Sequence, residues 1–156
     1  YGNQILVGRF KEFGLPDLEY TEVKHETLGQ IAVLSVPGRP LKEMKGKAVL
    51  DFLDPDLVVD VYNPTKGLKF ALHSYLDVFD ANGLDLPKSG RLITNVTIMV
   101  RKSGGKAFKL GDNFEGEIEF TCNRFVQGLA DQTPIREIDV FNQVNRIAGK
   151  DVWPTY

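Results

Sequence analysis

Apolar and polar side chains alternate with the two-residue period of a β-strand through much of this chain, and this pattern constrains the fold most. The alternation runs through residues 68–78, 92–101 and 117–123. A strand of this kind buries one face and leaves the other in water, as in antiparallel sheets. Shorter strand-like stretches are 4–10, 18–25, 47–53 and 135–140. The sequence therefore predicts a mainly β, antiparallel fold.

One short helix is predicted between the strands. Asp54 is a suitable N-cap, and Pro55 suits the first helical position. Asp56 complements the helix dipole, and Asn63-Pro64 ends the helix. The apolar side consists of Leu57, Val58 and Val61. A helix of about two turns is marginal alone, so it should pack against a sheet.

Glycine-containing turns are expected to separate the strands. The candidates are Asn82-Gly83, Ser103-Gly104-Gly105 and Gly111-Asp112-Asn113. The spacing between residues 80 and 91 indicates a longer loop rather than a tight two-residue hairpin.

The length of 156 residues fits a single domain, 1–156, with a buried core. The net charge of −2 provides no basic excess for binding duplex DNA through its phosphates. Basic residues predominate over 61–110, and acidic residues predominate over 1–60 and 111–156. These charges lie on solvated strand faces and loops, or they form complementary faces between copies of the chain.

No group of residues predicts catalysis, a cofactor or a metal ion. His25 and His73 lack the HxxxH or HExxH spacing of zinc sites, and residues 77–85 lack the EF-hand pattern. Residues 103–106 lack the spacing of a phosphate-binding loop. The lone cysteine, Cys122, falls on the apolar face of its strand and should be a buried, inert thiol.

Membrane association is not expected either. No stretch approaches the roughly 20 apolar residues of a membrane span. No charged-then-apolar leader is visible at the start of the sequence.

Residues 29–46 form an apolar segment interrupted by two prolines, Pro37 and Pro40. Its apolar members are Ile31, Val33, Leu34, Val36, Leu41 and Met44. A surface loop of a monomer should be more polar than this. We therefore expect an extended arm that packs on a neighbouring subunit.

The C-terminal segment, residues 134–152, interleaves polar and apolar residues densely. It contains REIDVFNQVNRIAGKD, in which Glu137-Ile138-Asp139 is followed by Asn142 and by Ile147-Ala148-Gly149-Lys150-Asp151. Its physical chemistry alone predicts an ordered, polar-rich end of the domain.

This segment resembles the closing signature of the major tail tube proteins of contractile-tailed phages and R-type pyocins. In that family a strand is followed by E-I-D, then N, then I-x-G-x-D. GDNFEGEIEFTCNRF resembles the family's acidic and aromatic strand, and residues 15–29 resemble its early Leu-Pro strand. The resemblance implies an antiparallel β-sandwich or small barrel with one short packed α-helix, a fold that type VI secretion tube proteins share.

The resemblance further implies a structural virion protein. Six copies would form a ring, and rings would stack into the inner tube of a contractile tail, the conduit for DNA during ejection. The implied partners are other copies of the chain, the tail sheath, the baseplate and the tail terminator, with DNA passing through unbound. Assembly would take place in the host bacterial cytoplasm.

Two sets of residues are candidates for these roles. The subunit-interface candidates are Val36, Arg39, Leu41, Met44, Arg136, Asp139, Asn142 and Arg146. The candidates for lining the lumen are Glu117, Glu119, Thr121 and Asn123. Negative charge on this strand would repel DNA phosphates and let the genome slide.

Three other functions are less well supported by the sequence, and the last of them, a small hydrolase, is disfavoured because no nucleophile and base stand at suitable spacing. A type VI-like or pyocin-like tube would carry protein or no cargo. A β-sandwich that binds carbohydrate or peptide would need an aromatic groove, and the aromatic residues are scattered along the chain. A small hydrolase would need a nucleophile and a base at suitable spacing.

Overall fold

The computed structural model describes residues 10–29, 31–50, 55–105, 109–111 and 115–153, without the side chain of Lys11. Its elements in chain order are β1 (Phe10–Phe13), β2 (Tyr20–His25), β3 (Leu34–Leu41), β4 (Lys45–Leu50), α1 (Pro55–Val61), β5 (Leu68–Leu76), β6 (Phe79–Asp80), β7 (Gly83–Leu84), β8 (Gly90–Gly105), β9 (Gly116–Leu129), β10 (Arg136–Asp139), β11 (Val144–Ile147) and β12 (Lys150–Asp151). The predicted mainly β, antiparallel fold is confirmed.

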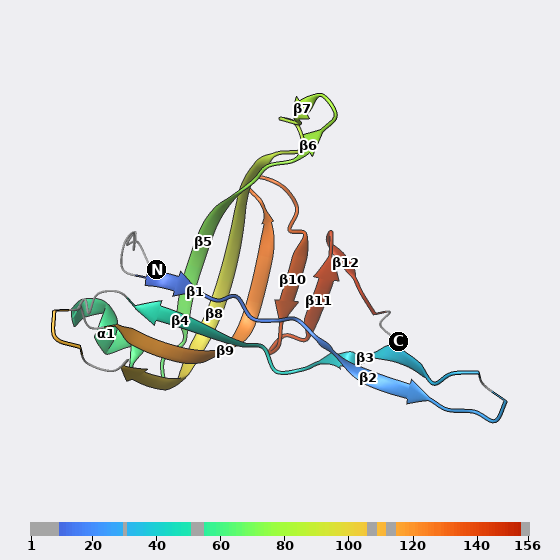
Figure 1. Ribbon diagram of the computed structural model, residues 1–156, viewed down its shortest axis with the longest axis horizontal. Helices are drawn as coiled ribbons and strands as arrows, with labels where there is room; N and C mark the ends of the chain where they lie inside the picture. The colour runs from blue at the N-terminus through green and yellow to red at the C-terminus, as the bar shows by residue number, and fades with distance from the viewer. Residues whose placement is uncertain (1–9, 30, 51–54, 106–108, 112–114, 154–156) are drawn as a thin grey trace.

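The body of the molecule is an eight-stranded antiparallel sheet organised around β9 (Figure 1). One edge of β9 pairs with β8, which pairs in turn with β5. The other edge is shared: the first half of β9 pairs with β4 and the second half with β10. The sheet then continues through β1 on one side and through β11 and β12 on the other.

The sheet curves over its own apolar face. Phe10 and Phe13 of β1 approach Phe70 of β5, with ring centroids 5.7 Å and 5.5 Å apart, although the two strands are far apart in the pairing order. The two strands do not pair with each other, so the described part of the sheet does not close into a barrel. The sequence-based alternative of a small closed barrel is therefore not realised there.

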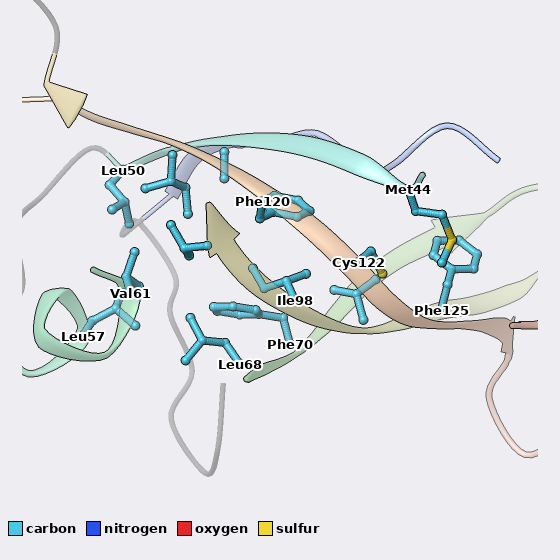
Figure 2. Packing of buried hydrophobic residues seen from close by; sticks show 14 of the residues in the cluster. Met44, Leu50, Leu57, Val61, Leu68, Phe70, Ile98, Phe120, Cys122 and Phe125 are labelled. Carbon is cyan, nitrogen blue, oxygen red and sulfur yellow. The ribbon is translucent and has the colours of Figure 1, made fainter. Parts of the chain in front are cut away.

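The core fills the inside of this curve, and α1 covers one end of it (Figure 2). Leu57 and Val61 of the helix are buried near Leu50, as the predicted apolar side requires. The predicted N-cap, Asp54, lies outside the described residues. Strand residues of the core include Leu68, Phe70, Val96, Ile98, Val100, Ile118, Phe120 and Cys122.

A β-bulge in β9 interrupts the simple alternation that the sequence suggests. Thr97 of β8 pairs with Arg124, whereas the next residue pairs with Cys122, so Asn123 is an extra residue in β9. Cys122 and Phe125 are consequently both buried. A bulge inserts one residue and shifts the pattern of buried positions by one.

Several sequence predictions about local structure need correction or lie outside the described residues, as Asp112 and Asn113 of the predicted Gly111-Asp112-Asn113 turn do. Residues 103–105 do not form a turn; they end β8 and pair with residues 116–118 of β9. Gly104 and Gly105 are therefore the last residues of β8 that pair with β9. The predicted strand at 4–10 falls almost entirely outside the described residues, which begin at Phe10.

Candidate assembly surfaces

Much of the predicted arm, residues 29–46, is β3, which pairs with β2 in a two-stranded hairpin that projects from the body (Figure 1). We call this β2–β3 hairpin the arm. Strands β2 and β3 pair with each other and with no other described strand. Pro37 lies opposite Glu22, and Gly38 packs so closely on Thr21 that a Cβ would lie 2.6 Å from the Thr21 hydroxyl oxygen. The proline-bearing segment is thus one strand of a hairpin rather than a single extended strand.

The tip of this hairpin, which we define as residues 26–29 and 31–33, exposes large apolar side chains. Leu28 and Ile31 are fully exposed, and Val33 is about half exposed. Leu34, at the start of β3, is also about half exposed. Monomeric proteins rarely present clustered apolar groups on a projecting element, and such groups mark sites of interaction.

The four interface candidates in the arm lie in different environments. Val36 is half-buried opposite Val23 within the hairpin, and Arg39 is exposed at its root. Leu41 packs against the core. Met44 is only 3% exposed and belongs to the core, so its side chain offers no surface to another subunit. The interface prediction for Met44 therefore does not fit its place in the fold.

The C-terminal motif forms the turn between β10 and β11. One carboxylate oxygen of Asp139 accepts hydrogen bonds from the backbone N–H groups of Phe141 (3.1 Å) and Asn142 (3.2 Å). The other accepts from the Asn142 side-chain amide at 2.8 Å. These bonds lower the pKa of Asp139, and the Asn142 side-chain amide has the largest effect. Arg124, at 3.9 Å, lowers it further. The turn chemistry is thus completed within one subunit.

The rest of the motif closes the next turn. Arg146 of β11 donates to Asp151 of β12 at 3.0 Å. Ala148 and Gly149 between them have positive φ values of 52° and 79°, in the left-handed region that glycine adopts most easily. Arg136 is half-buried on β10. Asp139, Asn142 and Arg146, predicted to hold neighbours in register, make their described contacts inside the subunit.

The predicted lumen-facing residues lie on the outward face of β9, opposite the core. Glu117, Glu119 and Thr121 alternate with buried residues, whereas Asn123 lies in the bulge. Glu119 lies between two cations, with Lys47 at 3.4 Å and Arg101 at 3.5 Å. Its charge is therefore compensated within the subunit.

The outward face of the four strands β4, β5, β8 and β9 is basic. Over β4, β5, β8 and β9 its acidic residues are Glu117 and Glu119, and its basic residues are Lys45, Lys47, Lys69, Arg91, Arg101, Lys102 and Arg124. The predicted repulsion of DNA by Glu117 and Glu119 stays a prediction, and both carboxylates lie among basic residues on these four strands. A shallow depression in it is lined in part by Lys69, Thr97 and Arg124.

Comparison with known families decides the identity of the chain. The model of the family described as phage tail tube protein FII matches residues 2–156. The chain belongs to this family. Its members are structural components of the tail, and the resemblance seen in the C-terminal motif is thereby confirmed.

Other comparisons add little to this assignment of a tail tube protein. Comparison with curated proteins gives no match. Among solved structures, the chain resembles one described as the sheath–tube complex of an extracellular contractile injection system, PVC, in the extended state. Sequence identity is 12%, the TM-score is 0.45, and the match covers 83% of this chain and 94% of that one.

Groups with reactive chemistry are not assembled into a site in the described part of this tail tube protein. Cys122 is buried, its thiol donates to the carbonyl oxygen of Arg124 at 3.0 Å, and burial raises its pKa to about 11. The predicted inert thiol fits this environment. Among the described residues, no cluster of His, Cys, Asp and Glu could hold a metal ion, and no helix is long and apolar enough to cross a membrane.

Two features of the tail tube protein escaped sequence analysis. The loop that carries β6 and β7 forms a second projection, with Phe79 and Leu86 well exposed (Figure 1). In addition, Trp153 contacts Tyr20 and Arg39 at the root of the arm. More than 100 residues separate Trp153 from these partners, so no local pattern in the sequence indicates the contact.

Proposed function

We propose that this chain forms hexameric rings that stack into the inner tube of a contractile tail, through which DNA passes during ejection. The observation that carries the proposal is the apolar tip of the β2–β3 hairpin, exposed on a member of the tail tube family. Burial of apolar area contributes about 25 cal/mol per Å², so the tip gains stability when a second copy covers it.

The open edge of β5 supports closure into a ring. In the described residues β5 pairs only with β8, and its other edge leaves backbone N–H and C=O groups unpaired by strands. An exposed edge strand is a template for pairing with another chain. A head-to-tail contact of this kind generates a ring when the rotation closes.

The proposed surroundings follow from membership of the tail tube family. The tube would lie inside a tail sheath, between a baseplate and a tail terminator, in a virion assembled in the host bacterial cytoplasm. A single domain over 1–156, with the arm reaching a neighbour, is the unit of this assembly.

The basic outward face of the sheet favours one alternative, a pyocin-like or type VI-like tube that carries protein or no cargo. If this face lines the lumen, Lys69 and Lys102 would attract phosphates instead of letting DNA slide. Passage of DNA therefore fits better with a lumen lined by other residues or shielded at this face. Density inside imaged tubes, before and after nuclease treatment, distinguishes a DNA cargo from the alternative.

Negative-stain microscopy of the purified protein tests the assembly itself. We expect rings or tubes about 100 Å wide, the size of about six ~30 Å domains around a pore. A protein that stays monomeric over a wide concentration range would contradict the proposal.

The arm is tested by replacing the exposed side chains of its tip. Leu28→Ser combined with Ile31→Ser should leave the fold intact, since both side chains are fully exposed, and should abolish stacking of rings. The matched control is Leu110→Ser, because Leu110 is equally exposed but lies between β8 and β9. Sedimentation measures stacking, and circular dichroism measures folding. Stacking that survives in the tip variant would show that the tip is not the contact.

A further inference from the structure

The arm is joined to the body by a small set of contacts at its root. Its two strands form a separate sheet and share no ladder with the eight-stranded sheet in the described residues. An isolated two-stranded hairpin is only marginally stable in water, and within the ladder Leu41 of β3 packs against the core. The contacts at the root therefore decide where the tip points.

Trp153 is in contact with both strands of the arm at this root. Its ring meets the ring of Tyr20, the first residue of β2, edge to face at 6.2 Å and 85°. The guanidinium carbon of Arg39, in β3, lies 5.7 Å from the centroid of the same indole ring. Edge-to-face aromatic pairs and cation–π contacts of this kind are both attractive.

The segment that carries Trp153 is itself fixed to the body. The backbone N–H of Val152 donates to the carbonyl of Asn145 in β11 at 3.0 Å. The side-chain amide of Asn145 donates in turn to the hydroxyl of Tyr20 at 3.0 Å. Strand β11 belongs to the main sheet through β10, so a continuous path of contacts runs from the sheet to the arm.

We propose that Trp153 is a positioning residue for the arm: by contacting Tyr20 and Arg39 it fixes the direction in which the β2–β3 hairpin leaves the subunit. We call Tyr20, Arg39, Asn145 and Trp153 the root contact. Its geometry stands independently of assembly, and its consequence for stacking rests on the proposed function. With the direction set, the tip meets its neighbour without a further ordering cost.

Distances between spin labels test this role directly. Labels are attached at Leu28→Cys in the tip and Lys69→Cys on the sheet, both exposed, while buried Cys122 stays in place. The label on the tip should also keep the subunits unassembled during the measurement. We expect a narrow distance distribution with Trp153 present and a broad one in Trp153→Ala, with Trp153→Phe between them. A distribution equally narrow in Trp153→Ala would overturn the proposal.

The matched control is Phe141→Ala, since Phe141 is an exposed aromatic residue in the same C-terminal region, between β10 and β11. It should leave the distribution narrow. Equal broadening by this control would show a general loss of C-terminal structure and would contradict a specific role for Trp153.

The chain has a single tryptophan, so its fluorescence reports on the root contact alone. Arg39→Ala should increase quenching of Trp153 by acrylamide, and Arg39→Lys should restore part of the protection. Unchanged quenching in Arg39→Ala would contradict a contact between Arg39 and Trp153.

Stacking is measured separately, in chains without labels. The concentration needed for tubes should rise roughly tenfold in Trp153→Ala, as expected for loss of these two aromatic contacts. If the unaltered chain forms no tubes, the proposed function fails while the spin-label result still decides the root contact. If tubes form equally well in both, the root contact does not serve assembly.

Discussion

Asp139 shows how one residue of the C-terminal motif acts through local chemistry. Its charged form accepts three hydrogen bonds across the β10–β11 turn, which is why its pKa is lowered. A group whose pKa is lower in the folded state stabilises the fold above its unfolded pKa, about 3.9 for an aspartate. That stabilisation is lost as the pH falls through the lowered folded-state pKa.

Removing the Asn142 side-chain amide, the donor that lowers the pKa of Asp139 most, should therefore change stability in a pH-dependent way. Asn142→Ala should raise the pKa of Asp139 and lower the urea midpoint at neutral pH. The difference from the unaltered chain should shrink at acidic pH, as the pH falls through the lowered pKa of Asp139 and its carboxylate becomes protonated. The control is Asn82→Ala, an exposed asparagine in the β6–β7 turn. A difference that is the same at both pH values would show that the Asp139 charge is not involved.

At the scale of elements, the close approach of β4 to β9 depends on Gly46. A Cβ at this position would lie 2.6 Å from the ring of Phe120 and 2.7 Å from the carbonyl oxygen of Gly14. Gly46→Ala should lower the free energy of unfolding by about 1–3 kcal/mol, as overpacking does in cores. Gly104→Ala is the control, because a Cβ at Gly104 meets nothing within 4 Å. Urea unfolding measures both, and equal effects would contradict the role assigned to Phe120.

How far the sequence predicts an element depends on whether the pattern that defines it is local. The alternation in 68–78 and the capping residues around Pro55 are local, and they identified β5 and α1 to within two residues. The bulge at Asn123 and the burial of Met44 depend on partners elsewhere in the chain. The root contact at Trp153 is of the same kind, so only the assembled fold reveals it.

At the scale of the whole molecule, part of the uneven distribution of charge is compensated inside the subunit. Arg101, from the basic stretch 61–110, meets Glu119 of the acidic stretch 111–156 at 3.5 Å. Lys47 reaches the same carboxylate. The sequence allowed complementary charges to join separate copies, and the fold brings these charges together within one copy. We therefore expect the exposed apolar tip to be a stronger driving force for association than these charges.

This difference predicts how assembly responds to salt. At about 1 M salt the Debye length is about 3 Å, so exposed charge pairs between subunits would be screened, whereas apolar contacts would persist. We expect tubes of the unaltered chain to remain intact at this salt concentration. The variant with Leu28→Ser and Ile31→Ser should form no tubes at any salt concentration. Light scattering during a salt titration measures both. Tubes of the unaltered chain that dissolve as salt rises would instead place the decisive contacts between the basic outward face of one subunit and acidic groups of the next.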